Sequence, residues 1–229
     1  MVFIFIVFFL RVLRVLCGEI LKEMGKGLLF VVSAPSGTGK TTLCRAMTRV
    51  FPELHYSVSY TTRPPRPGDE NGRDYHFISP AEFQERIDRR DFAEWAEIYG
   101  YRYGTSRSVI EKIRSEGRDV ILDIDGQGAR QLREKNLGGI FIFVLPPSLA
   151  ELRRRLSRRG TESAAALRER LMKARAEMTE AREYEYLIIN DDLEKTKDRL
   201  QAVIVAEHQR RACMAEVLED LLNEKADFS

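Results

Sequence analysis

The sequence predicts an α/β fold in which a parallel five-stranded sheet is flanked by helices, and three observations support this class. Short runs of consecutive apolar residues occur at 28–33, 120–125, 140–145 and 186–190. Continuous apolarity, unlike alternation, is typical of strands buried on both faces. Amphipathic stretches separate the runs, and a glycine-rich turn follows the first of them. Strands and helices that alternate in this way imply right-handed crossovers and a parallel sheet.

The elements follow one another in a regular order. The first strand, LLFVVS, leads through the turn APSGTGKT into a helix, TLCRAMTRVF. Further helices are expected at four places, and a last helical stretch is expected from about residue 192 to 223. The four are 106–116, 127–135, 148–158 and 164–182.

Between about residues 57 and 104 this rhythm breaks. The segment holds a turn rich in proline and glycine (TTRPPRPGDENG), a short strand (DYHFI), a helix opened by Ser79-Pro80 and an aromatic strand (FAEWAEIY). We therefore expect residues 59–104 to form a small mixed insertion. The core then comprises residues 24–58 and 105–229.

Composition excludes several classes of function. The 37 basic and 35 acidic residues give a net charge of +2, so no global attraction to nucleic acid is expected. The three cysteines form no CxxC pair, which argues against a zinc site and a disulfide framework and suits a reducing compartment. The three histidines are not spaced as a set of metal ligands.

The N-terminal segment is unusual because residues 2–10 are all apolar. A membrane span needs about 20 such residues, and a signal peptide carries its positive charge before the apolar run, not after it. A targeting or anchoring segment stays open as an alternative. We expect residues 1–23 to be a dispensable extension and the globular chain to begin at Met24.

The turn after the first strand matches the phosphate-binding pattern GxxxxGK[ST], except that Ala34 stands at its first position. In such a loop successive backbone N–H groups and the positive end of the following helix face phosphate groups. We expect Lys40 to reach the transferred phosphate and the Thr41 hydroxyl to bind Mg²⁺. The candidate ATP-binding residues of this loop are Ala34, Pro35, Ser36, Gly37, Thr38, Gly39, Lys40, Thr41 and Thr42.

Four strings after this loop carry a family resemblance. They are SVSYTTRPPRPGDENGRDYHF, FAEWAEIYGYRYGTSR, VILDIDGQGA and IINDD, and in this order the chain resembles guanylate kinase over residues 27–210. The resemblance implies a P-loop core, a GMP-binding insertion and a mobile lid. It also implies transfer of the γ-phosphoryl group of MgATP to GMP or dGMP, giving ADP and GDP, with ATP and GMP as partners and Mg²⁺ as cofactor.

The acceptor site is expected within the insertion. Guanidinium groups grip phosphate bidentately, and Arg63 and Arg66 lie on a stiff proline segment. By resemblance they bind the GMP phosphate together with the hydroxyls of two tyrosines, and a glutamate reads guanine with the help of two further hydroxyls. These are Tyr75 and Tyr103 for the phosphate, and Glu94, Ser59 and Thr105 for the base. Tyr101-Arg102 departs from the family pattern beside this site.

Asp123 and Asp125 end an apolar strand, the edge at which open parallel sheets bind ligands. By resemblance Asp123 is the carboxylate that handles Mg²⁺, mostly through water, and Asp125 lies nearer to GMP. Without the phosphate loop, two aspartates that merely end a strand would be the favoured interpretation. Gly126 stands where the family usually has a larger residue.

A basic run, RRRLSRR at 153–159, has three interpretations. Clustered arginines bind nucleic-acid backbones, but no aromatic residue is interleaved here for base stacking, and a solvated helix face is the ordinary outcome. By resemblance Arg155, Arg159 and Arg170 belong to a lid at about 153–175 that closes on the ATP phosphates. Asn190 resembles a residue near the adenine, although Asn and Asp at this point would also suit a helix cap.

Two other functions remain as alternatives. A related interaction domain that has lost catalysis would bind peptides, but the intact Lys40, Thr41 and lid arginines argue against it. A kinase of a phosphorylated sugar would not need a base reader such as Glu94 with Ser59. We expect a cytoplasmic enzyme with no nucleic-acid partner and no stable membrane association; the sequence is compatible with an oligomer.

Overall fold

The structure of the chain is a computed structural model, which describes residues 26–157, 164–210 and 212–223. The predictions for residues 1–23 and for Arg159 concern residues outside these ranges. Within them, none of the helices combines the length and the apolar composition that crossing a membrane would require.

The predicted parallel sheet of five strands is confirmed. Its strand order is β2-β7-β1-β8-β9, and every pair in it is parallel. The strands are β1 (Leu29–Ser33), β2 (Leu54–Tyr56), β7 (Asp119–Asp123), β8 (Ile140–Leu145) and β9 (Tyr186–Ile189). The central strand β1 is buried along its whole length, as its continuous apolar run predicts.

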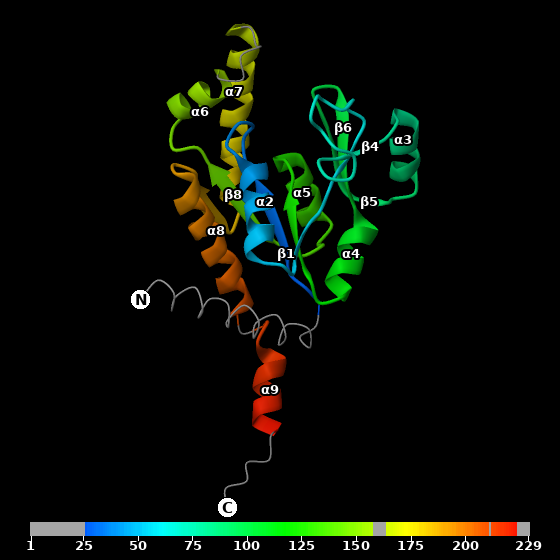
Figure 1. The fold of residues 1–229 in the computed structure, drawn as a ribbon, viewed down its shortest axis with the longest axis vertical. Coiled ribbons are helices and arrows are strands. Elements are labelled where there is room, and N and C mark those ends of the chain that lie inside the picture. The colour runs from blue at the N-terminus through cyan, green and yellow to red at the C-terminus, as the bar shows by residue number, and fades with distance from the viewer. Residues whose placement is uncertain (1–25, 158–163, 211, 224–229) are drawn as a thin grey trace, which may run out of the picture.

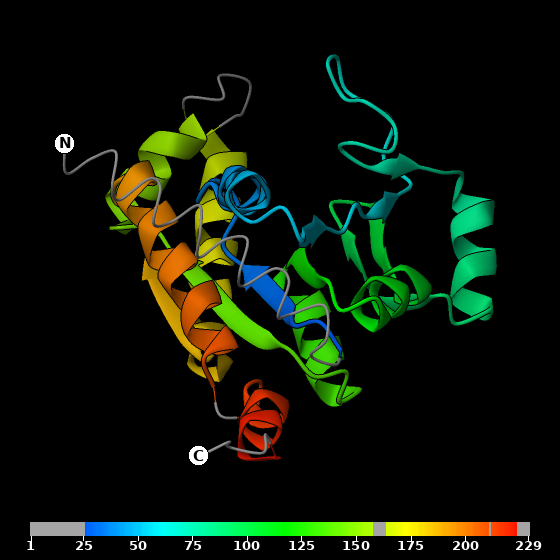
Figure 2. The same cartoon turned by 60° about the horizontal axis from the view of Figure 1, so that its bottom comes forward.

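Helices cover both faces of this sheet (Figures 1 and 2). Phe30 and Val32 of β1 point into one core, to which α2 (Lys40–Val50) and α8 (Leu193–His208) contribute. Leu29 and Val31 point into the opposite core, which includes residues of α4 (Arg107–Ser115), α5 (Gly126–Glu134) and the short 3₁₀ helix η1 (Glu180–Glu183). The result is a three-layer α/β/α arrangement.

A second, mixed sheet stands beside the first, with strand order β4-β3-β6-β5. Its strands are β3 (Tyr60–Thr61), β4 (His76–Phe77), β5 (Phe92–Ile98) and β6 (Tyr101–Ser106), and α3 (Pro80–Asp88) packs beside it. Ser79 caps α3 by accepting the N–H of Glu82, and Pro80 opens it, as the Ser-Pro signal predicts. The strands β3 and β4 pair in parallel, whereas the other pairs are antiparallel.

Two helices, α6 (Leu149–Ser157) and α7 (Ala164–Thr179), pack against each other near the end of β8 (Figure 1). Leu152, Leu156 and Ala174 form a small core of their own there. The last helical stretch differs from the prediction, because it is divided into α8 and α9 (Ala215–Asn223). His208, the last residue of α8, is buried and pairs with Asp119 at the start of β7 (2.7 Å).

Candidate functional site

A cavity of about 380 Å³ lies at the carboxyl ends of β1 and β7, between the loop before α2, the mixed sheet and α7. The structure brings most of the predicted residues to its wall. They are Ala34, Pro35, Ser36, Gly37, Gly39, Lys40, Thr41, Thr42, Ser59, Arg66, Tyr75, Glu94, Tyr103, Asp123, Asp125 and Arg170. Thr38, Arg63, Thr105, Arg155 and Asn190 are not among the lining residues, but they contact residues of the wall or of its surroundings.

The loop between β1 and α2 has the geometry that the phosphate-binding pattern requires. Gly37 and Gly39 both have positive φ angles, of 88° and 97°, which residues with a side chain rarely adopt. The helix α2 begins directly after Gly39, so its first N–H groups and its positive end face the cavity. This end of the cavity can bind an anion.

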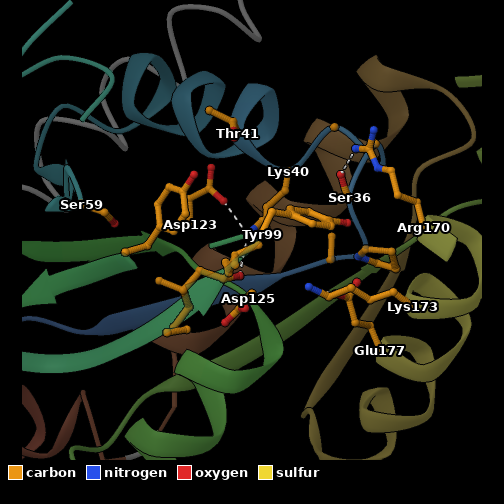
Figure 3. A pocket seen from close by; sticks show the side chains of 18 of the residues that line it. Ser36, Lys40, Thr41, Ser59, Tyr99, Asp123, Asp125, Arg170, Lys173 and Glu177 are labelled. Atoms are coloured by element: carbon orange, nitrogen blue, oxygen red, sulfur yellow. Dashed lines mark hydrogen bonds and ion pairs between the residues drawn. The ribbon is translucent and has the colours of Figure 1, made fainter. Parts of the chain in front are cut away.

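Lys40 provides a fixed positive charge beside these N–H groups (Figure 3). Its Nζ lies 2.7 Å from Asp123 Oδ1 and donates a hydrogen bond to the carbonyl of Ile124 (2.5 Å). Burial alone would lower the pKa of Lys40, but the charge and hydrogen bond of Asp123 outweigh it and raise the pKa above its usual 10.5. Lys40 is therefore protonated throughout the physiological pH range.

Asn190 follows β9 and is almost fully buried (5% exposed). Its side-chain amide donates to the carbonyl of Thr38 in the phosphate-binding loop (2.6 Å) and accepts from the Thr196 hydroxyl (3.1 Å). The Asn190 side chain thus stabilises the conformation of the phosphate-binding loop through this hydrogen bond. The prediction that it lies near the adenine stays a prediction.

Two of the three predicted lid arginines lie within the described residues, and both contact the phosphate-binding loop or its support. Arg170 of α7 donates to the hydroxyl of Ser36 (2.6 Å), as Figure 3 shows. Arg155 of α6 donates to the carbonyl of Asn190 (3.0 Å) and pairs with Glu151 (2.8 Å). Positive charge from the α6–α7 pair is therefore already held close to the anion-binding end.

The two aspartates after β7 have different surroundings. Asp123 pairs with Lys40 and also accepts a hydrogen bond from the hydroxyl of Tyr56 (3.3 Å). Asp125 caps α5, because its Oδ1 accepts the N–H of Gly128 (2.9 Å). Both line the cavity, so the predicted acidic pair is present at the expected edge of the sheet.

Glu94 lies on β5, at the part of the cavity wall formed by the mixed sheet, and is 4% exposed. Its carboxylate accepts a hydrogen bond from the Thr105 hydroxyl on β6. Burial raises the pKa of Glu94 from 4.5 to about 7, although the Thr105 hydrogen bond and the charges of Lys40 and Lys135 oppose that rise. A buried carboxylate of this kind suits a ligand with adjacent hydrogen-bond donors.

The predicted phosphate-binding arginines differ in their surroundings. Arg66 is exposed and lines the cavity, whereas Arg63 is 7% exposed. Arg63 pairs with Asp69 (2.8 Å), and its guanidinium carbon lies 5.3 Å from the ring centre of Tyr75. Tyr75 in turn packs edge-on against Tyr103 (5.7 Å between centroids), so these predicted residues form one cluster.

The sequence interpretation missed several residues at this site. Tyr99, Lys173 and Glu177 also line the cavity, and Lys173 Nζ lies 4.8 Å from the ring centre of Tyr99 (Figure 3). No local pattern marks them. Gly128 and Gln131 of α5, together with Lys135 at its end, contact the segment around Glu94. Their spacing on one face of the predicted helix 127–135 was the available signal.

Comparison with known proteins gives a consistent result. The family model for guanylate kinase matches residues 26–207. The chain is 49% identical over 198 residues to a guanylate kinase of Geobacter sulfurreducens, covering 86% of this chain and 98% of that one. It is 50% identical over 201 residues to a guanylate kinase of Syntrophus aciditrophicus, covering 88% and 97%. The crystal structure of guanylate kinase from Anaplasma phagocytophilum superposes with a TM-score of 0.70 at 33% identity, covering 86% of this chain and 95% of that one.

Proposed function

The chain belongs to the guanylate kinase family and is an ATP:GMP phosphotransferase, and on this premise we propose how its residues divide the work. The observation that carries the proposal is that one cavity has an anion-binding loop on one side and the buried Glu94 on another. The donor nucleotide binds at the loop and the acceptor at the mixed sheet. The two phosphates then meet near Lys40 and Asp123.

The donor side consists of the loop 34–42. Its backbone N–H groups hold the phosphates of ATP, and Lys40 neutralises charge on the transferred group. The positive φ angles of Gly37 and Gly39 and the fixed position of Lys40 support this assignment. We assign Asn190 to the adenine side of the donor site, from the family resemblance alone.

Mg²⁺ enters as part of MgATP. Thr41 and Asp123 both line the cavity and offer hard oxygen donors, which Mg²⁺ prefers. Among the described residues no cluster of three or more acidic, His or Cys side chains is placed to hold a metal. This suits an ion held mainly by water and nucleotide phosphates, with few protein ligands. We propose that Thr41 and Asp123 hold Mg²⁺ there, Asp123 mostly through water, where the ion would supply charge neutralisation.

The acceptor side reads the base and the phosphate of GMP separately. Guanine offers two adjacent donors, N1–H and the exocyclic amine, and the two oxygens of Glu94 accept both. Its burial and its hydrogen bond with Thr105 support this role. Ser59 and Thr105 assist at the base, and Asp125 lies toward the acceptor nucleotide. The phosphate is held by Arg63, Arg66, Tyr75 and Tyr103.

The reaction is an in-line transfer of the γ-phosphoryl group to a phosphate oxygen of GMP. That oxygen is already anionic, so the enzyme needs no general base of high importance and forms no covalent intermediate. The main requirement is stabilisation of charge on the transferred group. We assign this role to Lys40, Arg155, Arg159 and Arg170, supported for two of the lid arginines by their contacts with the loop or with Asn190.

The same proposal divides the chain into a core (24–58 and 105–229), with a lid at about 153–175, and a GMP-binding insertion (59–104). We further propose a cytoplasmic location, ATP and GMP as partners, no nucleic-acid partner and no stable membrane association. The experiment that tests the function is a panel of GMP, dGMP, AMP, IMP and UMP, each with MgATP and purified protein, monitored by coupled ADP release. We expect GMP and dGMP to be turned over far more efficiently than the other three nucleotides; equal turnover of AMP would refute the acceptor assignment.

A further inference from the structure

The strand that carries Glu94 is held from its outer edge by a helix of the core. The strand β5 lies at the edge of the mixed sheet, so every second residue has main-chain groups that meet no neighbouring strand. At Trp95 the side-chain amide of Gln131 forms the hydrogen bonds that a neighbouring strand would otherwise form with the main chain. Its Nε2 donates to the Trp95 carbonyl (2.5 Å), and its Oε1 accepts the Trp95 N–H (3.3 Å).

A second contact holds the other side of Glu94. The pairing of β5 with β6 shifts register between Phe92 and Glu94, which leaves Ala93 as an extra residue in the strand. Such bulges re-aim the neighbouring side chain. Lys135 Nζ donates to the carbonyl of Ala93 (2.7 Å). The main chain is thus fixed on both sides of Glu94 by side chains from α5 and its end.

The third contact is a close van der Waals approach of Gly128 to the Glu94 carboxylate. A Cβ atom built on Gly128 would lie 2.3 Å from Glu94 Oε2 and 2.9 Å from its Cδ. The carboxylate therefore occupies the volume that any other residue at position 128 would fill. Positions 128, 131 and 135 share one face of the helix, since they are three and four residues apart.

We propose that Gly128, Gln131 and Lys135 are positioning residues for base recognition, which together set where the carboxylate of Glu94 lies. The proposal rests on the proposed role of Glu94 as the guanine reader. The helix α5 begins directly after Asp125, so these contacts fix the base reader relative to the acidic pair and the phosphate-binding loop. Placement of the base and of the reacting phosphate is thereby linked through one rigid element.

Gly128→Ala is the sharpest test, because it separates recognition from stability. Alanine is the better helix former, but its Cβ would displace the Glu94 carboxyl group, whose Oε2 and Cδ both lie under 3.0 Å from that position. These two effects oppose each other, so we expect the melting temperature to change little. We also expect kcat/KM for GMP to fall about 100-fold, the cost that a misplacement of about 1 Å can have when it is caused by a mutation away from the reacting atoms. The preference for GMP over IMP should narrow, with KM for ATP unchanged.

Gln131→Ala and Lys135→Met test the other two contacts, and Glu134→Ala on the exposed side of the same helix is the matched control. We expect Gln131→Ala and Lys135→Met each to lower the ratio of kcat/KM for GMP to kcat/KM for IMP about tenfold, in line with one or two lost hydrogen bonds. The control Glu134→Ala should leave this ratio unchanged. Lys135→Arg, which keeps a donor, should restore most of the ratio. A merely structural role would lower the active fraction for all substrates alike and leave the ratio unchanged.

Glu94→Gln, measured with the same substrates, distinguishes failure of the positioning role from failure of the assignment of Glu94 as the base reader. If Gly128→Ala and Gln131→Ala keep the GMP/IMP ratio while Glu94→Gln loses it, the positioning role is overturned and the base reader stands. If Glu94→Gln also keeps the ratio, the assignment of Glu94 is wrong and the positioning proposal falls with it.

Discussion

Glu94→Gln should make the protein more stable at alkaline pH while it impairs recognition of GMP. The folded-state pKa of Glu94 is about 7, whereas the usual value is 4.5. The unfolded state therefore binds fewer protons between these values, and the free energy of unfolding falls as pH rises from about 4.5 through 7. At about 1.36 kcal/mol for each pKa unit, the ionised carboxylate costs about 3 kcal/mol at pH 8. Glutamine has no such cost.

Urea denaturation of both proteins at pH 5 and pH 8 measures this difference. We expect the advantage of Glu94→Gln over the natural chain to be about 2–3 kcal/mol larger at pH 8 than at pH 5. Comparing the two pH values removes any constant effect of the substitution on the Thr105 contact. An advantage that did not change with pH would refute the raised pKa and the burial argument behind it.

The same variant tests recognition. Glutamine turns one acceptor into a donor that faces a donor of guanine, so kcat/KM for GMP should fall about 100-fold, the value of a charge-assisted hydrogen bond with its desolvation cost. The ratio of kcat/KM for GMP to kcat/KM for AMP should become smaller, and KM for ATP should hardly change.

In the natural chain kcat/KM for GMP should also fall below about pH 7, as Glu94 gains a proton. The phosphate of GMP titrates nearby, but that contribution persists in Glu94→Gln and can be subtracted. A full GMP/AMP ratio in the variant would show that the base is read elsewhere.

Three further results are expected. Lys40→Ala should collapse turnover yet leave GMP affinity largely intact in calorimetry without ATP; equal loss of GMP affinity would contradict the separation of donor and acceptor sites. Arg155→Ala and Arg170→Ala should each lower kcat by orders of magnitude, since arginines in related phosphoryl transfer supply roughly 10³–10⁵-fold. If they raised only KM for ATP, they would be ground-state binders. A chain that begins at Met24 should be soluble and keep its turnover, measured as ADP release; loss of either would mean that residues 1–23 support the fold.

The features that the sequence predicted correctly are those with a local signature. The strand, glycine turn and helix around Lys40 are contiguous, and the apolar runs of the core strands are long enough to recognise. The strands β2 and β3 have three and two residues, too few for a periodic pattern. Their positions depend on pairing with β7 and β6, which lie far along the chain.

The candidate site was predictable residue by residue only where a motif or a family string covered it. The contacts of Gln131 and Lys135 with the main chain of β5 join segments 36 and 42 residues apart. A hydrogen bond to a main-chain group does not constrain the type of the residue that provides this group. The sequence of β5 therefore gives no indication of these contacts. The division between α8 and α9 was missed for a similar reason, because no glycine or proline stands between His208 and Ala215.

The place of β1 in the sheet has a consequence for synthesis on the ribosome. This strand is the first element of the described chain, yet it occupies the centre of the sheet, and its partners β7 and β8 follow much later. Leu29 pairs with Val120, and Phe30 pairs with Ile140. While the chain emerges, both edges of an apolar strand stay unpaired until more than half of the protein has been made. Assembly of the core cannot follow the order of translation, and a nascent chain halted before Ile140 retains an open, aggregation-prone strand edge.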